Sequence, residues 1–238
     1  MLPRDCDAQF RVMNEAFYDS LMPVFHPTGN VPEDKAHSRA SQIKHLKEIN
    51  DVGRYMVVID TSAKPLHDDL VDLSDEDRKA AEAEGRMAGF GYWKFYPKDR
   101  TDAELDEEVE KGKSEPLPPS ANAAAMGVFF KALGRDRREI LGGKAYYLLN
   151  VLAVDPAYHR KGIGAMHLKW GLDQADELGV PAFLEASPYG QPLYARWGFE
   201  PMYRTRIPEE DMHHFKGQEA FIPMIMYRPA KSTASKAS

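Results

Sequence analysis

The sequence predicts a single mixed α/β domain, and three observations support this prediction. Segments with apolar residues three or four positions apart alternate with short segments rich in β-branched and aromatic residues. A chain of 238 residues with 43% hydrophobic content can bury one large core, and no change in composition marks a second compact unit. Residues 146–202 also contain an apolar strand, a basic glycine-bearing turn and a helix in succession. We expect one domain over 1–230, with insertions at about 61–86 and 97–144.

The composition disfavours several classes of protein. A formal charge of -6 and a pI near 5.8, with scattered basic residues, argue against a general nucleic-acid binder. No apolar run approaches the roughly 20 residues that span a bilayer, and the N-terminus lacks a secretory signal pattern. Cys6 is the only cysteine, and eight histidines without paired spacing predict no metal site. We expect a soluble cytoplasmic protein that binds neither nucleic acid nor membrane.

The first hundred residues predict helices and strands in alternation. Apolar residues recur every three or four positions over 5–22 and over 35–49, which predicts two helices. Residues 54–60 are rich in β-branched side chains and predict a short strand. A serine followed by three acidic residues begins a charged, solvated helix over 74–85. A second strand is expected over 87–96.

The second half begins with a charged segment and ends in a compact set of elements. Residues 97–120 contain many acids and several prolines, which predicts a mobile excursion instead of a linker between domains. A helix is expected over 121–140, and the nearly continuous apolar run 145–154 is typical of a strand buried on both faces. The remaining pattern predicts a helix over 161–178, a strand over 181–187, a short helix over 191–197, strands over 199–207 and 219–228, and a disordered tail over 231–238.

The turn after the apolar strand predicts an anion-binding site. Residues 161–165 read Lys-Gly-Ile-Gly-Ala and open a helix, so that successive backbone N–H groups and the helix dipole face one point. A nucleotide P-loop does not fit, because Gly164 precedes Ala165 where that motif has Lys. A dinucleotide fingerprint does not fit either, because His167 takes its third glycine position. We therefore expect a phosphate-bearing ligand; the alternative is that Gly162 and Gly164 only allow close packing.

Two motifs in this region resemble a known family. Residues 159–164, His-Arg-Lys-Gly-Ile-Gly, resemble motif A of the GNAT superfamily of N-acetyltransferases, usually Gln/Arg-x-x-Gly-x-Gly/Ala. His159 departs from that pattern at its first position. Residues 193–199, Leu-Tyr-Ala-Arg-Trp-Gly-Phe, resemble motif B of the same family. The resemblance implies a mixed, mostly antiparallel sheet flanked by helices. The family normally begins with a strand, which here is either absent or reduced to residues 1–4.

The resemblance also implies a cofactor and the residues that hold it. Acetyl-coenzyme A would place its pantetheine arm in a splay between strands 147–154 and 183–187, and Ser187 would lie near it. Main-chain groups of one strand end would bind the pantetheine, and the turn would bind the pyrophosphate. The implied cofactor contacts are Leu152, Ala153, Val154, His159, Arg160, Lys161, Gly162, Ile163, Gly164, Ala165 and Ser187.

Acetyl transfer from a thioester to an amine needs a neutral amine and a proton for the departing thiolate. An alkylammonium with a pKa near 10.4 is only about one part in a thousand neutral at pH 7, so deprotonation costs roughly 4 kcal/mol. A phenol with a pKa near 10 can protonate a thiolate whose thiol has a pKa near 8.5, if the two are in contact. Tyr194 stands where the family uses a tyrosine as general acid. The alternative is a core tyrosine that packs on Phe199.

Two further residues are candidates for handling the amine and its proton. Glu185 is a carboxylate in an otherwise apolar segment and shares a face with Phe183 and Ser187, so its placement needs an explanation. It is a candidate general base, an edge residue or the structural partner of a basic group. Asn150 interrupts the apolar strand, and its amide either orients the amine or a water, or the residue occupies a bulge.

The favoured function is transfer of an acetyl group to the primary amine of a metabolite or xenobiotic, by direct attack in a ternary complex. Trp93, Tyr147 and Tyr189 are candidates for contacts with the acceptor, with core packing as the alternative. The two insertions favour a capped pocket over an open peptide groove. A peptide or protein acetyltransferase and a non-catalytic acyl-coenzyme A sensor are the alternative functions. The sequence leaves open the acceptor, the base, the acyl-chain preference and the choice between monomer and homodimer.

Overall fold

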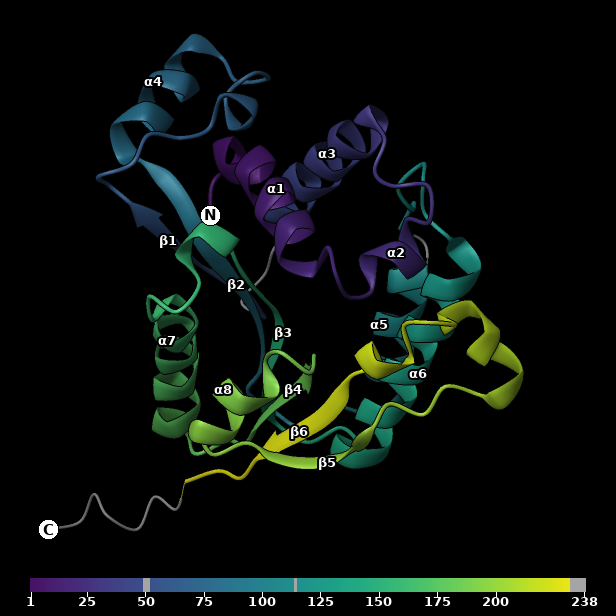
Figure 1. The fold of residues 1–238 in the computed structure, drawn as a ribbon. Helices are drawn as coiled ribbons and strands as arrows, with labels where there is room; N and C mark the ends of the chain where they lie inside the picture. The colour runs from purple at the N-terminus through teal and green to yellow at the C-terminus, as the bar shows by residue number, and fades with distance from the viewer. Residues whose placement is uncertain (49–51, 114, 232–238) are drawn as a thin grey trace, which may run out of the picture.

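The computed structural model describes residues 1–48, 52–113 and 115–231, and its centre is one open six-stranded sheet (Figure 1). The strand order is β1-β2-β3-β4-β6-β5. The β3–β4 pair is parallel, and the other neighbouring pairs are antiparallel. This arrangement confirms the predicted fold class. The strands are β1 (Gly53–Asp60), β2 (Arg86–Tyr96), β3 (Tyr146–Val154), β4 (Ala182–Ala186), β5 (Glu200–Arg204) and β6 (Met224–Arg228).

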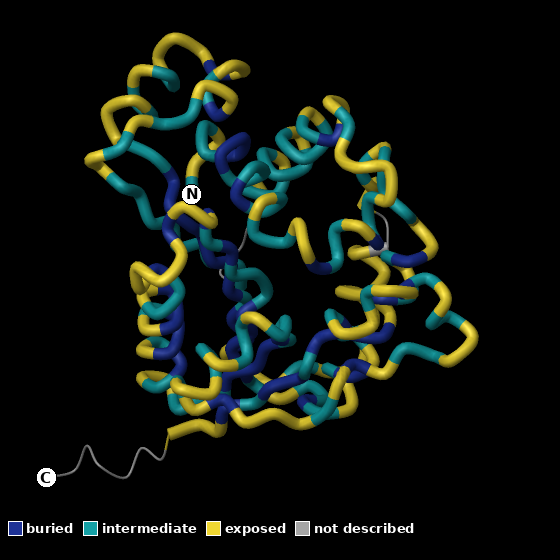
Figure 2. Tube along the Cα trace, viewed as in Figure 1, coloured by how far each residue is buried: buried dark blue, intermediate teal, exposed yellow. Residues whose placement is uncertain are grey.

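Helices cover both faces of the sheet, and its inner strands β2 and β4 are the most buried of its strands (Figure 2). The helices are α1 (Cys6–Phe17), α2 (Met22–Phe25), α3 (Pro32–Glu48), α4 (Asp75–Glu84), α5 (Asp102–Lys113), α6 (Ala123–Leu141), α7 (Ile163–Leu178) and α8 (Gln191–Arg196). One face packs on α7 and α8 through a core that includes Trp93, Leu149 and Leu168. The other face packs on α1 near Phe90 and on the end of α6 near Phe183. Within the described residues, no helix has the length and apolar character of a bilayer-spanning segment.

The charged segment 97–120 differs from its prediction, because α5 forms within it. Three of its acidic side chains pair with Arg138 of α6, with Arg100 inside the segment or with Tyr96 just before it. Arg138 of α6 donates to Asp102 at 2.7 Å and to Asp106 at 2.5 Å. Glu108 accepts hydrogen bonds from Arg100 and Tyr96. The contacts with Arg138 join this segment to α6, which a local pattern could not indicate.

Several boundaries also differ from the prediction. The first helix ends at Phe17, and α2 follows as a separate turn. Pro3–Asp5 form a 3-10 turn, so residues 1–4 are not a reduced first strand. The last strand begins only at Met224, after the 3-10 turn Glu219–Phe221. The predicted tail lies, from residue 232 onward, outside the described residues.

Candidate active site

The parallel pair β3–β4 opens partway along its length, as the predicted splay requires. Cα partners run from Tyr147 with Ala182 to Leu149 with Leu184. Beyond these residues β3 stays paired with β2 and β4 stays paired with β6. We call the opening between residues 150–154 and 185–187 the fork. Its β3 wall presents backbone groups that β4 does not bond.

Asn150 lies at the start of the fork in a β-bulge. Opposite it in β2, Tyr92 pairs with Val151 and Trp93 pairs with Leu149, so Asn150 is the extra residue. Bulges redirect a strand and are frequent beside active sites. The structure therefore shows the bulge that was the alternative explanation for this residue, while its catalytic role stays a prediction.

Beside the fork, the first turn of α7 presents a group of unpaired amides. Arg160 has φ 64° and Gly162 has φ 85°, and this left-handed backbone turns the chain sharply into the helix. The first helix-type bond into this turn is donated by the Met166 N–H to the Gly162 oxygen at 3.0 Å. Within the described part of the chain, the N–H groups of 162–165 have no acceptor. We call these four amides the amide cradle; they suit a phosphate group.

The two glycines of this turn are needed for different reasons. A Cβ on Gly162 would meet no heavy atom within 4 Å, so this glycine serves the backbone conformation and not close packing. A Cβ on Gly164 would lie 2.9 Å from Cδ2 of Leu193, a residue of α8. Gly164 therefore brings α8 against the first turn of α7, and the packing explanation holds for this glycine.

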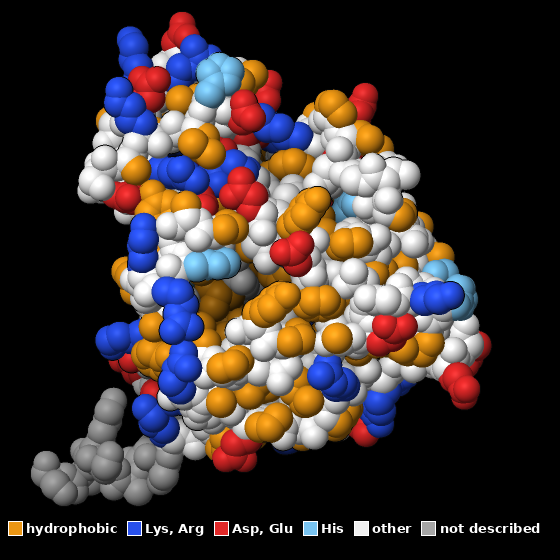
Figure 3. All heavy atoms as spheres, viewed as in Figure 1, with side chains coloured by type: hydrophobic (Ala, Val, Ile, Leu, Met, Phe, Trp, Pro, Cys, Tyr) orange, Lys and Arg blue, Asp and Glu red, His pale blue; other side chains and the backbone are white. Residues whose placement is uncertain are grey.

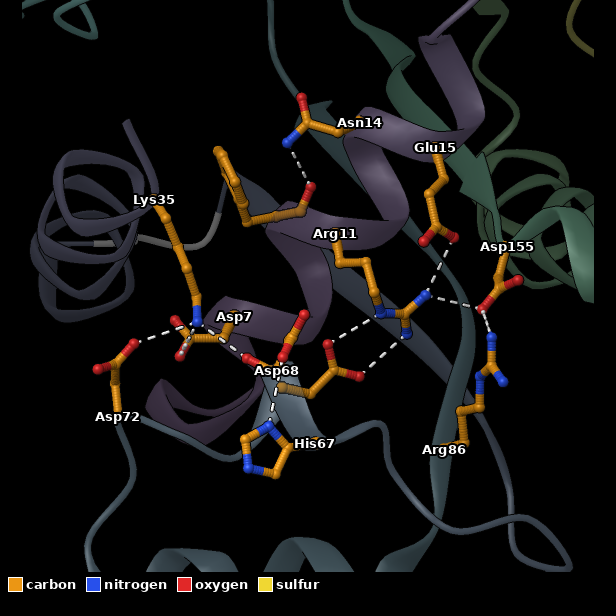
Figure 4. A network of polar contacts seen from close by, with 12 residues as sticks. Asp7, Arg11, Asn14, Glu15, Lys35, His67, Asp68, Asp72, Arg86 and Asp155 are labelled. Carbon is orange, nitrogen blue, oxygen red and sulfur yellow. Dashed lines mark hydrogen bonds and ion pairs between the residues drawn. The ribbon is translucent and has the colours of Figure 1, made fainter. Parts of the chain in front are cut away.

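A buried ion network fixes the turn that leads to the cradle (Figure 4). Asp155 follows β3 and is 1% exposed. Its carboxylate accepts hydrogen bonds from Arg11 of α1 at 2.8 Å, from Arg86 of β2 at 2.7 Å and from the Ala157 amide at 2.9 Å. Burial alone would raise the pKa of Asp155, but these donors lower it below its usual value. The cradle is thus tied to two elements distant in sequence.

The predicted general acid, Tyr194, is half-buried in α8. Its ring contacts Phe199 edge-on with centroids 6.1 Å apart, so the predicted packing contact exists. Among the described residues its hydroxyl has no hydrogen-bond partner. Burial raises the pKa of Tyr194, which keeps the phenol protonated at neutral pH. The side chain can therefore pack and hold a proton, and its role as acid stays a prediction.

The candidate base Glu185 is engaged in an ion pair. Its carboxylate accepts from Nε of Arg137 at 2.5 Å and from Nη2 at 2.9 Å, and its side chain is 7% exposed. The structure thus shows the structural pair that the sequence left as an alternative. Sequence reasoning missed Arg137, although the spacing gave a signal. Arg137 lies midway between the buried Leu133 and Leu141, so a charge on the apolar stripe of α6 required a buried partner.

The predicted acceptor contacts are only partly accessible. Trp93 and Tyr147 are 0% exposed and belong to the core between the sheet and α7, so neither lines an open site; this corrects the prediction. Tyr189 is 69% exposed and lies at the end of β4, where its ring contacts Phe221. Its neighbour Ser187 accepts hydrogen bonds from the Gly190 amide, which closes the turn into α8.

Two details concern the predicted cofactor contacts. The imidazole Nε2 of His159 lies 3.1 Å from the Val154 oxygen, so this side chain supports the turn. Leu152, Ala153 and Val154 form the β3 wall of the fork, and the side chain of Ala153 is buried. Figure 3 shows a hollow lined by hydrophobic side chains, next to Lys and Arg side chains over α7. Contacts of these residues with a cofactor stay predictions.

Comparison with known proteins gives a matching family model, a curated relative and solved structures of similar fold. A sequence model described as Acetyltransferase (GNAT) family matches residues 52–199. "Probable acyltransferase SID5" of Ajellomyces capsulatus is 33% identical over 67 residues, covering 28% of this chain and 49% of that protein. This chain therefore spans about half of the length of that curated relative.

Two solved structures share the fold. One, described as histone acetyltransferase HPA2 and related acetyltransferase from Corynebacterium glutamicum, is 17% identical with a TM-score of 0.52, over 98% of this chain and 94% of that chain. The other is the C-terminal condensation domain of Ebony in complex with beta-alanyl-dopamine, 12% identical with a TM-score of 0.57, over 96% of this chain and 95% of that chain. At these identities the likeness concerns the fold alone.

Proposed function

The chain belongs to the GNAT family of acetyltransferases, and we propose that it is an acyltransferase that moves the acetyl group of acetyl-coenzyme A to the primary amine of a small molecule. Direct attack in a ternary complex needs both substrates at the fork at once. The cofactor would enter beside α7, and the amine would approach from the face that α1 and α6 cover.

The observation that carries this proposal is the amide cradle at the open end of the fork. Four unpaired N–H groups at 162–165 suit a pyrophosphate, and the β3 wall formed by Leu152, Ala153 and Val154 offers backbone partners to a pantetheine arm. Micromolar binding needs about 8 kcal/mol. Four charge-assisted hydrogen bonds at about 1.5–3 kcal/mol each supply that order of free energy.

The side chains around the fork suggest how protons move. Acetyl-coenzyme A, when bound, supplies the activated acyl group. Tyr194 keeps its phenol proton at neutral pH and donates it to the leaving sulfur in this proposal. Glu185 is already paired with Arg137, so a water held by the Asn150 amide takes the proton of the attacking amine. Bulk solvent then restores the phenol proton.

The position of α6 favours a small acceptor over a peptide. This helix comes from the 97–144 insertion and packs through Leu141 against the same side of the sheet as Phe183. Its other end joins Phe129 and Leu133 to a separate core with Phe215. An extended peptide would have to displace this covered surface, whereas a small amine needs only the end of the fork.

A thiol-release assay tests the proposal. The purified protein is mixed with acetyl-coenzyme A and a panel of small primary amines, peptides with free N-termini and peptides with free lysines. We expect coenzyme A thiol to appear with at least one small amine. Release with peptides alone would select a peptide acetyltransferase. Acetyl-coenzyme A binding, measured by calorimetry, without thiol release from any acceptor would select a non-catalytic sensor.

A further inference from the structure

The end of β4 lacks one of its sheet neighbours where the fork begins. Leu184 is its last residue with a Cα partner in β3, and Glu185 is the first without one. On the other side, β6 continues to pair, with Ile225 opposite Glu185. The β4 wall of the fork is therefore held by the sheet from one side only.

Arg137 of α6 contacts β4 at this point. Both of its bonds go to Glu185, at 2.5 Å and 2.9 Å, in the bidentate geometry that a planar guanidinium and a carboxylate favour. The two side chains are 24% and 7% exposed, so water competes weakly with the pair. A bidentate ion pair fixes both the direction and the distance between the two side chains. A lysine, whose charge is a single ammonium group, would not reproduce this.

The segment behind Glu185 leads directly to the predicted acid. The Gly190 amide donates a hydrogen bond to the backbone oxygen of Ser187 at 3.0 Å, and the Tyr194 amide donates to the Gly190 oxygen at 3.1 Å. A shift of the β4 end would therefore move α8 and the Tyr194 hydroxyl relative to the β3 wall. The geometry of the fork depends on where Glu185 is held.

We propose that Arg137 is a positioning residue for acyl transfer: it holds Glu185, and thereby sets the width of the fork and the place of Tyr194. Glu185 then serves as the anchor of this pair and not as the general base. This inference rests on the proposed function and adds a residue to it. The inserted segment that supplies α6 is in this way part of the site.

The chain contains a matched pair for comparison. Arg228 of β6 donates to Asp176 of α7 at 2.6 Å and 2.9 Å, also bidentate and with side chains 8% and 18% exposed. Arg228 is the partner of Ala182, at the opposite end of β4 from the fork. Asp176→Asn leaves the bond from Arg228 Nε to the Trp197 oxygen at the end of α8 in place, at 3.1 Å, so it should affect stability without changing the fork.

The test compares Arg137→Ala, Arg137→Lys and Glu185→Gln with the control Asp176→Asn in the full chain. Thermal unfolding, acetyl-coenzyme A affinity by calorimetry, and kcat and KM across pH are measured. We expect Arg137→Ala and Glu185→Gln each to lower kcat/KM by about tenfold to a hundredfold and to weaken acetyl-coenzyme A binding, because misplacement of reacting groups by about 1 Å can cost about a hundredfold. Arg137→Lys should fall between these and wild type, and Asp176→Asn should bind acetyl-coenzyme A as wild type does.

The pH profile separates positioning from base catalysis. In Glu185→Gln the decrease of kcat/KM toward low pH should remain, while its maximal value should be lower than in wild type. The inference is overturned if Glu185→Gln removes that decrease at unchanged acetyl-coenzyme A affinity, or if Arg137→Ala behaves as wild type. Amide hydrogen exchange of residues 185–190 without cofactor gives an independent readout, and it should be faster in Arg137→Ala, Arg137→Lys and Glu185→Gln but not in Asp176→Asn. Absence of acetyl-coenzyme A binding to the wild-type protein would contradict the proposed function. The hydrogen-exchange data alone would then decide whether Arg137 holds β4.

Discussion

Tyr194 is the residue whose removal tests the proton donor most directly. Tyr194→Phe deletes the hydroxyl and keeps the edge-on contact with Phe199. We expect kcat to fall about a hundredfold, a typical contribution of a general acid, while acetyl-coenzyme A affinity stays near wild type. Steady-state kinetics with a free-thiol readout and calorimetry measure the two effects. Wild-type turnover across pH in this variant would remove the acid assignment.

The burial of His167 should make the stability of the protein depend on pH. This residue is 0% exposed, neither ring nitrogen has a partner among the described residues, and the ring lies against Gly91 of β2. Burial lowers the pKa of His167 to about 4, whereas an unfolded histidine titrates near 6.5. Between these values the unfolded chain binds the extra proton, so the free energy of unfolding should drop by about 3 kcal/mol as pH falls from 6.5 to 4.

Chemical unfolding at a series of pH values measures this slope. His167→Met removes the titrating group and should flatten the curve between pH 4 and 6.5, and the exposed His213→Gln serves as the matched control. An unchanged slope in His167→Met would assign the pH dependence to other groups.

At the scale of elements, the start of α7 depends on one backbone conformation. Gly162→Ala places a Cβ at φ 85°, which costs about 1–2 kcal/mol in the left-handed region, and the new methyl group sits in open space. We expect at least tenfold weaker acetyl-coenzyme A binding, because relief of this strain turns the four amides away from a common point. Gly127→Ala in α6 also adds a methyl group in open space and is the control. Equal acetyl-coenzyme A affinity in both variants, measured by calorimetry, would contradict the cradle.

The turn between β3 and α7 should be sensitive to its buried anion. Asp155→Asn leaves Arg11 and Arg86 facing a neutral amide, so we expect the free energy of unfolding to fall by about 3 kcal/mol. Asp99→Asn disrupts the exposed pair with Lys144 and should change stability little. Urea unfolding of both variants measures the difference. A stability loss no larger in Asp155→Asn than in Asp99→Asn would show that the network does not fix the turn.

The elements around the cradle were predictable because local pattern and burial agree there. The apolar run predicted a strand over 145–154, and β3 is Tyr146–Val154; the helix predicted to end at 178 does end at Leu178, where Gly179 follows in the left-handed conformation. The acidic α5 was not predictable, because its partner Arg138 stabilises it from α6, a different segment. The Arg137–Glu185 pair was not predictable for the same reason, because its two residues lie far apart in the sequence. Each charged residue could be noticed alone, but their contact exists only in the folded chain.

At the scale of the whole molecule, the fork divides the sheet into two halves. Strands β1, β2 and β3 form one half and β4, β6 and β5 the other, joined by the partners from Tyr147–Ala182 to Leu149–Leu184. A ligand that fills the fork should bind both halves together. Acetyl-coenzyme A at about 100 times its Kd should raise the free energy of unfolding by about 2.7 kcal/mol.

Adenosine 3′,5′-bisphosphate is the matched ligand, because it carries phosphates but no arm to enter the fork. At the same multiple of its own Kd it should stabilise the chain without slowing amide exchange at 147–149 and 182–186, whereas acetyl-coenzyme A should slow it. Equal protection by the two ligands would show that the arm does not bridge the halves.

The bulge at Asn150 also changes the face of the sheet that the odd-numbered side chains of β3 occupy. Before it, Tyr147 and Leu149 share the core with α7; after it, Val151 and Ala153 share the core with α1 on the opposite face. The extra residue therefore reverses the phase of the alternation halfway along the strand. Deleting Asn150 would place Val151 directly after Leu149, and regular alternation would then keep Val151 and Ala153 on the α1 face; the deletion would therefore remove the bulge at the start of the fork without turning over the far half of the strand.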